Sequence, residues 1–476
     1  MERTKRKKLA ITSGKLLPQL IVFTIPVLLT GVLQLLYNAA DLVVVGKYRG
    51  DVALAAVGST GALINLIVNV FIGLSVGANV LVARCVGAKD DEGISRASHT
   101  AVLISLIAGT VVGIFGVVTA KTLLRWMDSP DSVIDLSALY VKIYFAGMPF
   151  NMLYNFGAAV LRGMGDTKRP LIALSVSGLV NVGLNVVFVK GFDMNVEGVA
   201  IATVVSQVLA CGAVLAFLMN SKTACRVSLK KLRIHKKELL LMTRIGLPAG
   251  IQGSIFSISN VLIQKSVNGF GDVVMAGNSA AANIEGFVYT SMNSVYHAAL
   301  TFAGQNYGAG EWKRVKSVLY ETLAIVTVIG VVLGVSCYLA ASPLLGIYTD
   351  SKEAIAYGVT RMRYVCFPYF LCGVMDVLVG ILRGLGYSFV PMIVSIVGAC
   401  GFRVLWIYTV FIRWHKLSVL YLSYPVSWVL TALSDVICLL VVFKTVRRNC
   451  LERKAALAAG DHPDETEDEL SGDYID

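Results

Sequence analysis

Four acidic residues stand inside long apolar segments of this chain: Asp41, Glu285, Asp376 and Asp435. On insertion scales an acid at the centre of a membrane-spanning helix costs about 2.5–3.5 kcal/mol, so such residues usually face a partner or a cavity and carry function. Burial also penalises the charged form of a carboxylate. The chemistry that these residues offer is therefore the reversible binding of a proton or a small cation.

Asp41 has the most informative surroundings. Asn181 and Asn185 are four residues apart and share one face of a later predicted helix, and Thr203 stands in the next one. We expect these side chains to form a polar cluster in which Asp41 takes up and releases a proton. Pro26, on the same predicted helix as Asp41, removes a backbone hydrogen bond and can act as a conformational hinge. The alternative is that Asp41 caps the outer end of its helix.

Two acids of the second half are further candidates. Asp376 lies mid-helix, seven residues before Arg383, and should face the protein interior. Asp376 could couple an ion to transport, or it could form a structural hydrogen bond to a neighbouring helix, and the sequence leaves both roles open. Glu285 is a candidate cavity acid within reach of Lys265 or Arg403.

The remaining reactive side chains suggest packing roles. Asp435 lies near the end of its predicted helix and needs no special role, and His297 is expected to be a hydrogen-bonded packing residue. The nine cysteines are scattered without paired spacing, so neither a metal site nor a disulfide framework is expected. The chain has no HExxH, GxSxG or P-loop motif, so we expect no enzyme activity, no cofactor and no direct use of ATP.

The elements that carry these residues are apolar helices. A hydrophobic fraction of 56%, a charged fraction of 15% and a mean hydropathy of +0.71 exclude an ordinary soluble protein, and segments of about 20 apolar residues span a bilayer core. The pattern predicts an all-α membrane protein with twelve transmembrane helices. Their ranges are 17–45, 53–80, 97–119, 136–158, 170–189, 197–218, 240–265, 274–303, 318–340, 357–380, 389–412 and 419–443.

The chain repeats itself at an offset of 221 residues. Leu161–Gly165 (LRGMG) returns as Leu382–Gly386 (LRGLG), and Gly87-Ala88 returns as Gly308-Ala309. Each copy holds six predicted helices, and an even number means that both copies enter the membrane from the same side. We therefore expect two parallel six-helix lobes related by pseudo-two-fold symmetry, as in transporters with a site between the halves.

Basic residues predict the orientation and the domains. About 29 of the 42 lysines and arginines fall on the side shared by the two termini, which the positive-inside rule assigns to the cytoplasm of a cell inner (plasma) membrane protein. This topological charge argues against nucleic acid as a partner. Arg361 and Arg363 are exceptions on the outer side. We expect a basic N-terminus (1–15, with Lys5, Arg6, Lys7 and Lys8), an N-lobe (16–218), a linker (219–238), a C-lobe (239–443) and a tail (444–476) whose acidic end is disordered.

Several motifs together carry a family resemblance that extends from Leu16 to about Phe443. They are Ala83–Asp90 (ARCVGAKD), the two LRG turns, Gly198–Thr203 (GVAIAT) and Gly304–Ala309 (GQNYGA). In this order and duplicated, they resemble the multidrug and toxic compound extrusion (MATE) transporters, within the superfamily of multidrug, oligosaccharidyl-lipid and polysaccharide exporters.

The resemblance implies two six-helix lobes around a cleft that opens to either side, and export of organic cations driven by inward proton or sodium flow. In one branch of the family the ion is coupled in the N-lobe, and the matching residues here are Pro26, Asp41, Asn181 and Thr203. Asn185 stands where that branch has a second aspartate. The single remaining carboxylate weakens a sodium site and favours a single-proton mechanism.

A second branch of the family uses acids on the seventh and tenth helices. Here the seventh predicted helix offers Ser257, Ser259 and Asn260 but no acid, whereas Asp376 is on the tenth. We therefore favour an ion-coupled multidrug antiporter, monomeric and acting on small organic substrates among membrane lipids. The alternative is a flippase or exporter of a lipid-linked or anionic substrate, which should line its cleft with basic residues; only Lys265 and Arg403 qualify.

Overall fold

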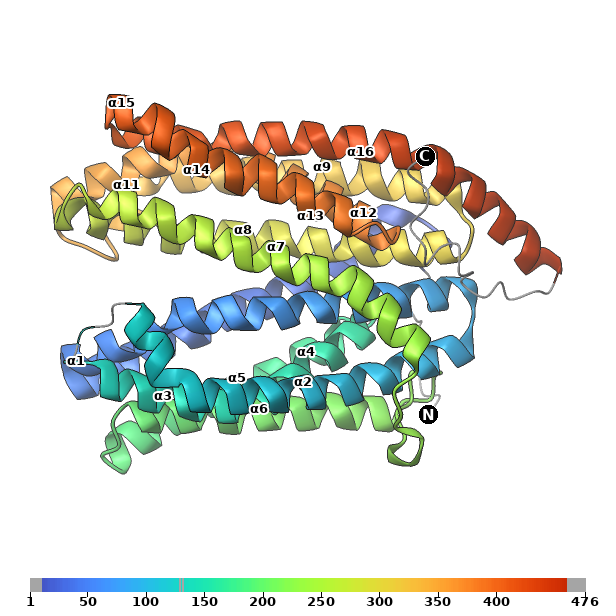
Figure 1. Ribbon diagram of the computed structural model, residues 1–476, viewed down its shortest axis with the longest axis horizontal. Helices are drawn as coiled ribbons and strands as arrows, with labels where there is room; N and C mark the ends of the chain where they lie inside the picture. Colours follow the sequence, from blue (N-terminus) through green and yellow to red (C-terminus); the bar gives the residue numbers. More distant parts are fainter. Residues whose placement is uncertain (1–10, 128–129, 131, 460–476) are drawn as a thin grey trace, which may run out of the picture. The chain divides into compact units, whose positions relative to one another are not determined.

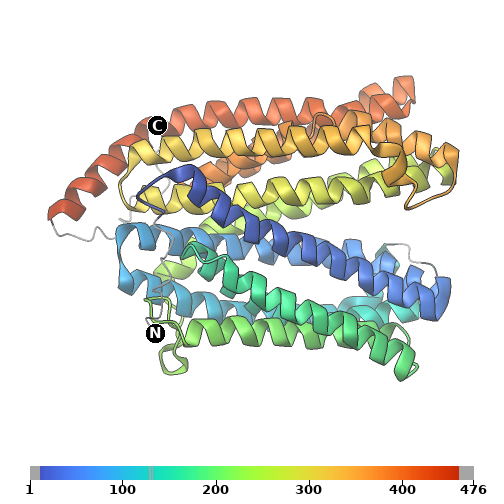
Figure 2. The same cartoon turned by 180° about the vertical axis from the view of Figure 1, so that it is seen from behind.

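A computed structural model describes residues 11–127, 130 and 132–459. This part of the chain is helical and contains no β-strand (Figures 1 and 2). The predicted basic cluster Lys5–Lys8 and the acidic end that begins at Gly460 lie outside the described residues.

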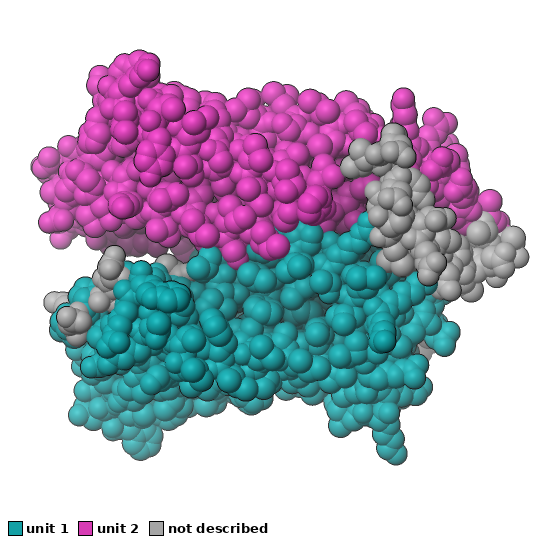
Figure 3. Space-filling model, in the orientation of Figure 1, with its two compact units in different colours: residues 1–9, 29–250 teal, residues 10–28, 251–476 magenta. Residues whose placement is uncertain are grey.

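The chain divides into two compact units, coloured separately in Figure 3. Unit 1 comprises residues 1–9 and 29–250, and unit 2 comprises residues 10–28 and 251–476. The boundaries after residues 28 and 250 each fall two residues after a proline inside a helix, Pro26 in the first case and Pro248 in the second. The first turns of α1 therefore pack with unit 2, and the first turns of α7 pack with unit 1.

Unit 1 is built from long helices joined by short turns. Its elements are α1 (Leu16–Ala88), α2 (Asp91–Trp126), α3 (Ile134–Ala146), α4 (Met148–Gly163), α5 (Lys168–Val186), the π-helical turn η1 (Val187–Gly191), α6 (Val196–Met219), the short 3-10 helix η2 (Leu229–Lys231) and the start of α7 (Lys236–Asn268). Helix α1 consists of two segments, because Gly50 has φ 77° and ψ −173°, a conformation that glycine adopts without strain. Helix α5 packs on α6, and α2 packs on α3 and α4.

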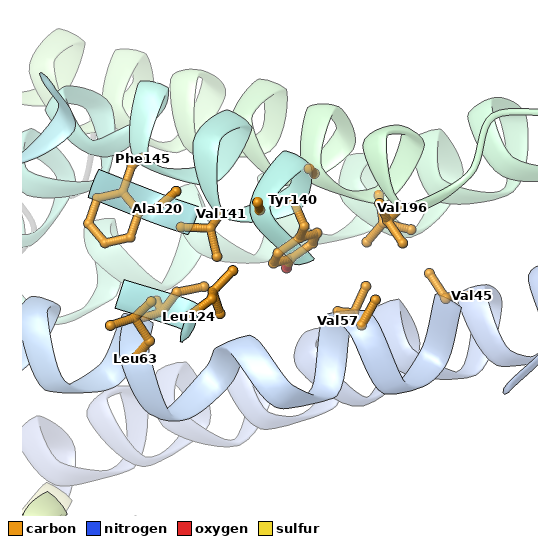
Figure 4. Close-up of a cluster of buried hydrophobic side chains, with 14 of the residues drawn as sticks. Val45, Val57, Leu63, Ala120, Leu124, Tyr140, Val141, Phe145 and Val196 are labelled. Atoms are coloured by element: carbon orange, nitrogen blue, oxygen red, sulfur yellow. The ribbon is translucent and has the colours of Figure 1, made fainter. Parts of the chain in front are cut away.

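The core of unit 1 lies between α1, α2, α3 and α6, as Figure 4 shows. Its labelled members are Val45, Val57, Leu63, Ala120, Leu124, Tyr140, Val141, Phe145 and Val196. Helices of this unit also carry apolar side chains on their exposed faces: Val118 on α2 is 75% exposed and Leu179 on α5 is 72% exposed. Helices that are apolar all round are typical of proteins surrounded by lipid.

Unit 2 repeats this order of elements with more interruptions. After the end of α7 it contains α8 (Asp272–Gly308), α9 (Trp312–Leu339), α10 (Ala341–Leu345), α11 (Lys352–Val365), α12 (Phe370–Gly384), α13 (Phe389–Ser395), η3 (Ile396–Gly401), α14 (Phe402–Trp406), η4 (Ile407–Phe411), α15 (Ile412–Trp414) and α16 (Leu417–Ala459), where η3 and η4 are π-helical. Helix α8 packs on α9, α11 and α12, and α16 packs on α11 and α12. The start of α1 joins this unit through Phe23, whose ring lies 5.5 Å from that of Phe302.

Nine helices of the described residues are long and apolar enough to cross a membrane, and α11 with α12 makes a tenth span bent by 45°. The predicted spans 274–303 and 136–158 correspond to the 37-residue α8 and to the pair α3 and α4. Each of the twelve predicted segments thus has a helical counterpart, and the predicted all-α, two-lobe fold is confirmed.

Two segments predicted as single helices are wrong in detail. The spans 136–158 and 357–380 are each broken into two helices, near Pro149 and near Pro368. A proline lacks the backbone N–H of a continuous helix, and it disfavours helical geometry in the residue before it.

Candidate ion-binding site

The structure brings together the four polar side chains of the predicted N-lobe cluster. Asp41 on α1 is only 7% exposed. Asn185 on α5 donates from Nδ2 to Asp41 Oδ1 at 2.5 Å and to Asn181 Oδ1 at 3.3 Å. Thr203 on α6 donates from Oγ1 to Asp41 Oδ2 at 3.3 Å. Three helices of unit 1 therefore meet at one carboxylate.

A close approach of α5 to α1 makes these bonds possible. Gly178 lies one turn before Asn181, and a Cβ atom at Gly178 would come within 1.8 Å of the ring of Tyr37. Tyr37 in turn lies one turn before Asp41 and donates its hydroxyl hydrogen to the carbonyl of Ser175 at 3.4 Å. Small residues let helix backbones approach in this way, so Gly178 determines how near the amides lie to the carboxylate.

The geometry of Asp41 differs from that of a helix cap. It lies nine residues before Gly50, where the first segment of α1 ends, and its hydrogen bonds go to side chains of other helices. Pro26 lies fifteen residues earlier in the same segment, within regular helical backbone, because the non-helical dihedrals inside α1 are those of Gly50. The hinge at Pro26 stays a prediction.

The surroundings of Asp41 are neutral. No lysine, arginine or histidine of the described residues forms an ion pair with it, and its bonded partners are an amide and a hydroxyl. The phenols of Tyr140 and Tyr144 on α3 lie near enough to interact electrostatically with Asp41. Asn185 Oδ1 is buried without a hydrogen-bond partner. The cluster can therefore hold Asp41 in either charge state. Hydrogen-bond donors stabilise the ionised carboxylate, and the amide oxygens can accept a hydrogen bond from the protonated acid.

The two tyrosines did not figure among the predicted site residues. Tyr140 and Tyr144 are four apart on one helix face, which was a usable signal. The spacing alone does not connect the two tyrosines with Asp41, because that connection depends on how α3 packs against α1 and α6.

Glu285 has a different partner from the two that the sequence suggested. Arg361 on α11 donates to it twice, from Nε at 2.8 Å and from Nη2 at 2.6 Å. Arg361 Nη1 also donates to Asn278 at 2.7 Å, and Asn278 accepts from Tyr421 at 3.1 Å. The prediction that Lys265 or Arg403 is the partner of Glu285 was therefore wrong.

Arg361, which the topology places toward the outer side of the membrane, is buried within unit 2 at 7% exposure. The sequence could not reveal this, because the side of α11 that faces α8 is determined by packing. Glu285 is therefore a neutralised acid held by a two-pronged ion pair.

The other predicted residues of the second half lie within unit 2. Asp376 on α12 has a buried Oδ2 without a hydrogen-bond partner and interacts electrostatically with Arg383. Arg403 is 2% exposed, donates to Ser427 at 2.9 Å and lies 4.4 Å from the centre of the Tyr424 ring. His297 packs edge to face against Tyr296 at 5.1 Å. No group of three or more metal-binding side chains occurs in the part of the chain that the structure describes.

A duplicated bundle of apolar helices with buried ionisable clusters is the architecture of a multi-pass membrane transporter. The family model MatE matches residues 26–187 and 248–409, so each match begins at the proline near a unit boundary. The chain belongs to this MATE family.

Two relatives and one solved structure illustrate the similarity. The probable multidrug resistance protein YoeA of Bacillus subtilis is 28% identical over 421 residues, which cover 87% of this chain and 91% of YoeA. The probable multidrug resistance protein NorM of Thermotoga maritima is 26% identical over 395 residues, covering 80% and 82% of the two chains. A crystal structure of MATE in complex with MaL6 superposes with a TM-score of 0.87 at 21% identity, covering 93% of this chain and all of that chain.

Proposed function

We propose that this protein exports amphipathic organic compounds, mainly cations, by antiport with protons, and that Asp41 binds the coupling proton. The observation that carries the proposal is a buried carboxylate whose partners among the described residues are all neutral. Such a group must gain a proton or a cation when it is fully removed from water, and it releases that charge when water reaches it.

A proton suits the cluster better than sodium. Sodium would need several oxygen ligands around a compensating charge, whereas the cluster offers one carboxylate, two amides and one hydroxyl, and Asn185 uses its nitrogen toward Asp41. A proton needs only one carboxylate oxygen and one acceptor. Asn181, Asn185 and Thr203 would then position Asp41, and Pro26 would let α1 bend during the cycle.

The driving force is sufficient for this exchange. A membrane potential of 100 mV contributes about 2.3 kcal/mol per entering charge, and each pH unit adds about 1.4 kcal/mol. Exporting a monovalent cation in exchange for one proton cancels the electrical contribution. Transport of cations should therefore follow the pH gradient alone.

The substrate class is supported by the relatives. YoeA and NorM are named as probable multidrug resistance proteins, and a MepA protein of Staphylococcus aureus as a multidrug export protein, 20% identical to this chain over 364 residues.

We place the chain in the cell inner membrane as a monomer with both termini in the cytoplasm, because basic residues gather in the linker 222–237 and after residue 443.

The test is efflux of a fluorescent lipophilic cation from proteoliposomes in sodium-free buffer under an imposed pH gradient. Wild type should transport, and Asp41→Asn should not, while remaining folded and inserted. Asp272→Asn is the matched control, because Asp272 is an exposed acid in the first turn of α8. Transport by wild type only with a sodium gradient would overturn proton coupling, and normal transport by Asp41→Asn would overturn the role of Asp41.

A second candidate is export of a lipid-linked or anionic substrate. Arg403 favours it, as a buried guanidinium that forms no ion pair with a carboxylate of the described residues. Its position against the Tyr424 and Trp428 rings gives it an alternative structural role. Failure of wild type to move the lipophilic cation under both a proton and a sodium gradient would favour this candidate.

A further inference from the structure

The linker between α6 and α7 contains a short segment, residues 229–234 (the linker loop), that combines basic and apolar side chains. Its sequence is Leu229-Lys230-Lys231-Leu232-Arg233-Ile234, and it begins with the 3-10 helix η2. Leu229 is 63% exposed and Ile234 is 37% exposed, and the three basic side chains are exposed as well. An exposed leucine is unfavourable in water but favourable where hydrocarbon surrounds it.

Both ends of the linker loop are held by neighbouring residues of α2. The backbone N–H of Ser228 donates to His99 Nε2 at 3.0 Å, and the backbone N–H of His235 donates to Thr100 Oγ1 at 3.2 Å. The six residues between these two hydrogen bonds therefore project from a fixed base, so the direction in which their side chains point is part of the fold.

The surroundings of the linker loop are basic. Residues 221–237 contain seven lysines and arginines and no acidic residue. The next acid along the chain, Glu238, forms an ion pair with Arg96 of α2 at 2.5 Å. Lys230 and Lys231 form no ion pair within the described residues. The positive charge of the loop is therefore available to an anionic partner.

The position of the linker loop brings it to the level of the lipid headgroups. Figures 1 and 2 show the connection between α6 and α7 as a loop that projects to the side at one end of the unit 1 helices. Long apolar helices cross the bilayer end to end, so a loop that projects sideways at their ends lies over lipid. In the proposed orientation this is the cytoplasmic leaflet, which carries anionic lipids.

We propose that the linker loop binds the anionic phospholipid headgroups of the cytoplasmic leaflet. Its basic side chains bind the phosphates, and Leu229 and Ile234 insert beside the first carbons of the acyl chains. Arg233 donates from Nε to His235 Nε2 at 2.9 Å, a bond that leaves its two terminal nitrogens for a phosphate. A lipid surface offers phosphates and hydrocarbon at adjacent depths, which a nucleic acid backbone does not.

The strength of this binding follows from the charge. Each lysine or arginine near an anionic membrane surface strengthens binding about fivefold, so three together strengthen it about a hundredfold. The loop leads directly into α7, whose first turns belong to unit 1 and whose remainder belongs to unit 2. Lipid binding therefore acts on the start of a helix that both units share. The inference rests on the proposed membrane orientation and not on the role of Asp41.

Hydrogen–deuterium exchange of the full-length protein in lipid nanodiscs tests this proposal. Peptides that cover residues 229–234 are compared in discs of phosphatidylglycerol, which is anionic, and of phosphatidylcholine, which is zwitterionic. Deuterium uptake reports contact at the loop and involves no transport, and both leaflets of a disc have the same composition. Failure of this surface is therefore distinguishable from failure of the proposed proton coupling or orientation.

We expect slower deuterium uptake of the linker loop in phosphatidylglycerol than in phosphatidylcholine. Replacing Lys230, Lys231 and Arg233 together by glutamine should abolish this difference. Lys230→Arg with Lys231→Arg keeps the charge and should retain it. Lys47→Gln with Lys190→Gln is the matched control, because it removes two exposed basic residues beside Tyr48, away from the loop, and should also retain the difference.

Three results would overturn the proposal. They are equal uptake in the two lipids for wild type, a difference that survives in the triple glutamine variant, and equally slow uptake in phosphatidylcholine discs after addition of an oligonucleotide or polyglutamate. The last result would mean that the loop takes any polyanion. Leu229→Ser should reduce the difference between the lipids without abolishing it, and an unchanged difference in that variant would overturn the insertion of the apolar side chains.

Discussion

Asp41 of unit 1 and Glu285 of unit 2 are buried beside opposite kinds of partner. In unit 1 the carboxylate of Asp41 contacts an amide and a hydroxyl and forms no ion pair within the described residues. In unit 2 Glu285 is locked by two hydrogen bonds from Arg361. Asp41 is thus a carboxylate that can change its charge, whereas Glu285 is an acid whose charge is fixed by its partner.

This difference separates an acid that can titrate during transport, Asp41, from an acid with a structural role, Glu285. A buried ion pair with both partners satisfied resists titration, because removing either charge strands the other. A carboxylate among neutral donors has no such penalty and responds to protons or cations. We infer that duplication preserved the helical scaffold while the buried charges of the two copies diverged.

The largest expected effect is on transport by Asp41→Asn, which should reduce proton-driven efflux to background. The amide keeps the size of the side chain but cannot bind and release a proton. Efflux from proteoliposomes under a pH gradient measures it, with Glu285→Gln as the contrasting variant of unit 2. Equal loss of coupling in both variants, at equal amounts of folded protein, would break the comparison between the units.

The effect on the free energy of unfolding should be larger for Glu285→Gln in unit 2 than for Asp41→Asn in unit 1. Glu285→Gln leaves Arg361 charged and buried, and we expect it to lower the free energy of unfolding by about 3–5 kcal/mol. Thermal unfolding in detergent checks this, and Glu285→Leu combined with Arg361→Met should recover most of the loss. The exposed pair Lys121–Asp135, 2.6 Å apart, provides the control, because Asp135→Asn should leave the unfolding temperature unchanged.

A smaller effect is expected at the contact that positions α5. Gly178→Ala forces a methyl group into the ring of Tyr37, and overpacking of this kind costs about 1–3 kcal/mol. Efflux should fall because Asn185 moves away from Asp41. Tyr37→Ala in the same chain should restore stability, and failure of that rescue would show that the close approach does not determine the site.

The smallest effect is expected for Thr203→Val. The bond from Thr203 to Asp41 is long at 3.3 Å, and the hydroxyl also bonds to the carbonyl of Val199 at 2.9 Å. Loss of one such bond costs about 0.5–1.5 kcal/mol, so the variant should still transport at a reduced rate. Complete loss of coupled efflux would make Thr203 a primary proton or cation ligand and require the cluster to be redefined.

The sequence by itself determined the scaffold and the residues of the first cluster. The length and apolarity of the segments predicted the helices, since a bilayer fixes the length of a spanning element, and the offset of 221 residues predicted two copies. The spacing of Asn181 and Asn185 predicted a shared helix face, because helical periodicity is a local property.

Only the tertiary structure decided which charges meet. The partner of Glu285 is Arg361, 76 residues along the chain, and Asp435 faces Asp376 and Arg383 from another helix. These pairings depend on the rotation of each helix about its axis. In helices that are apolar on nearly every face, hydrophobic periodicity does not specify that rotation, so packing contacts set it.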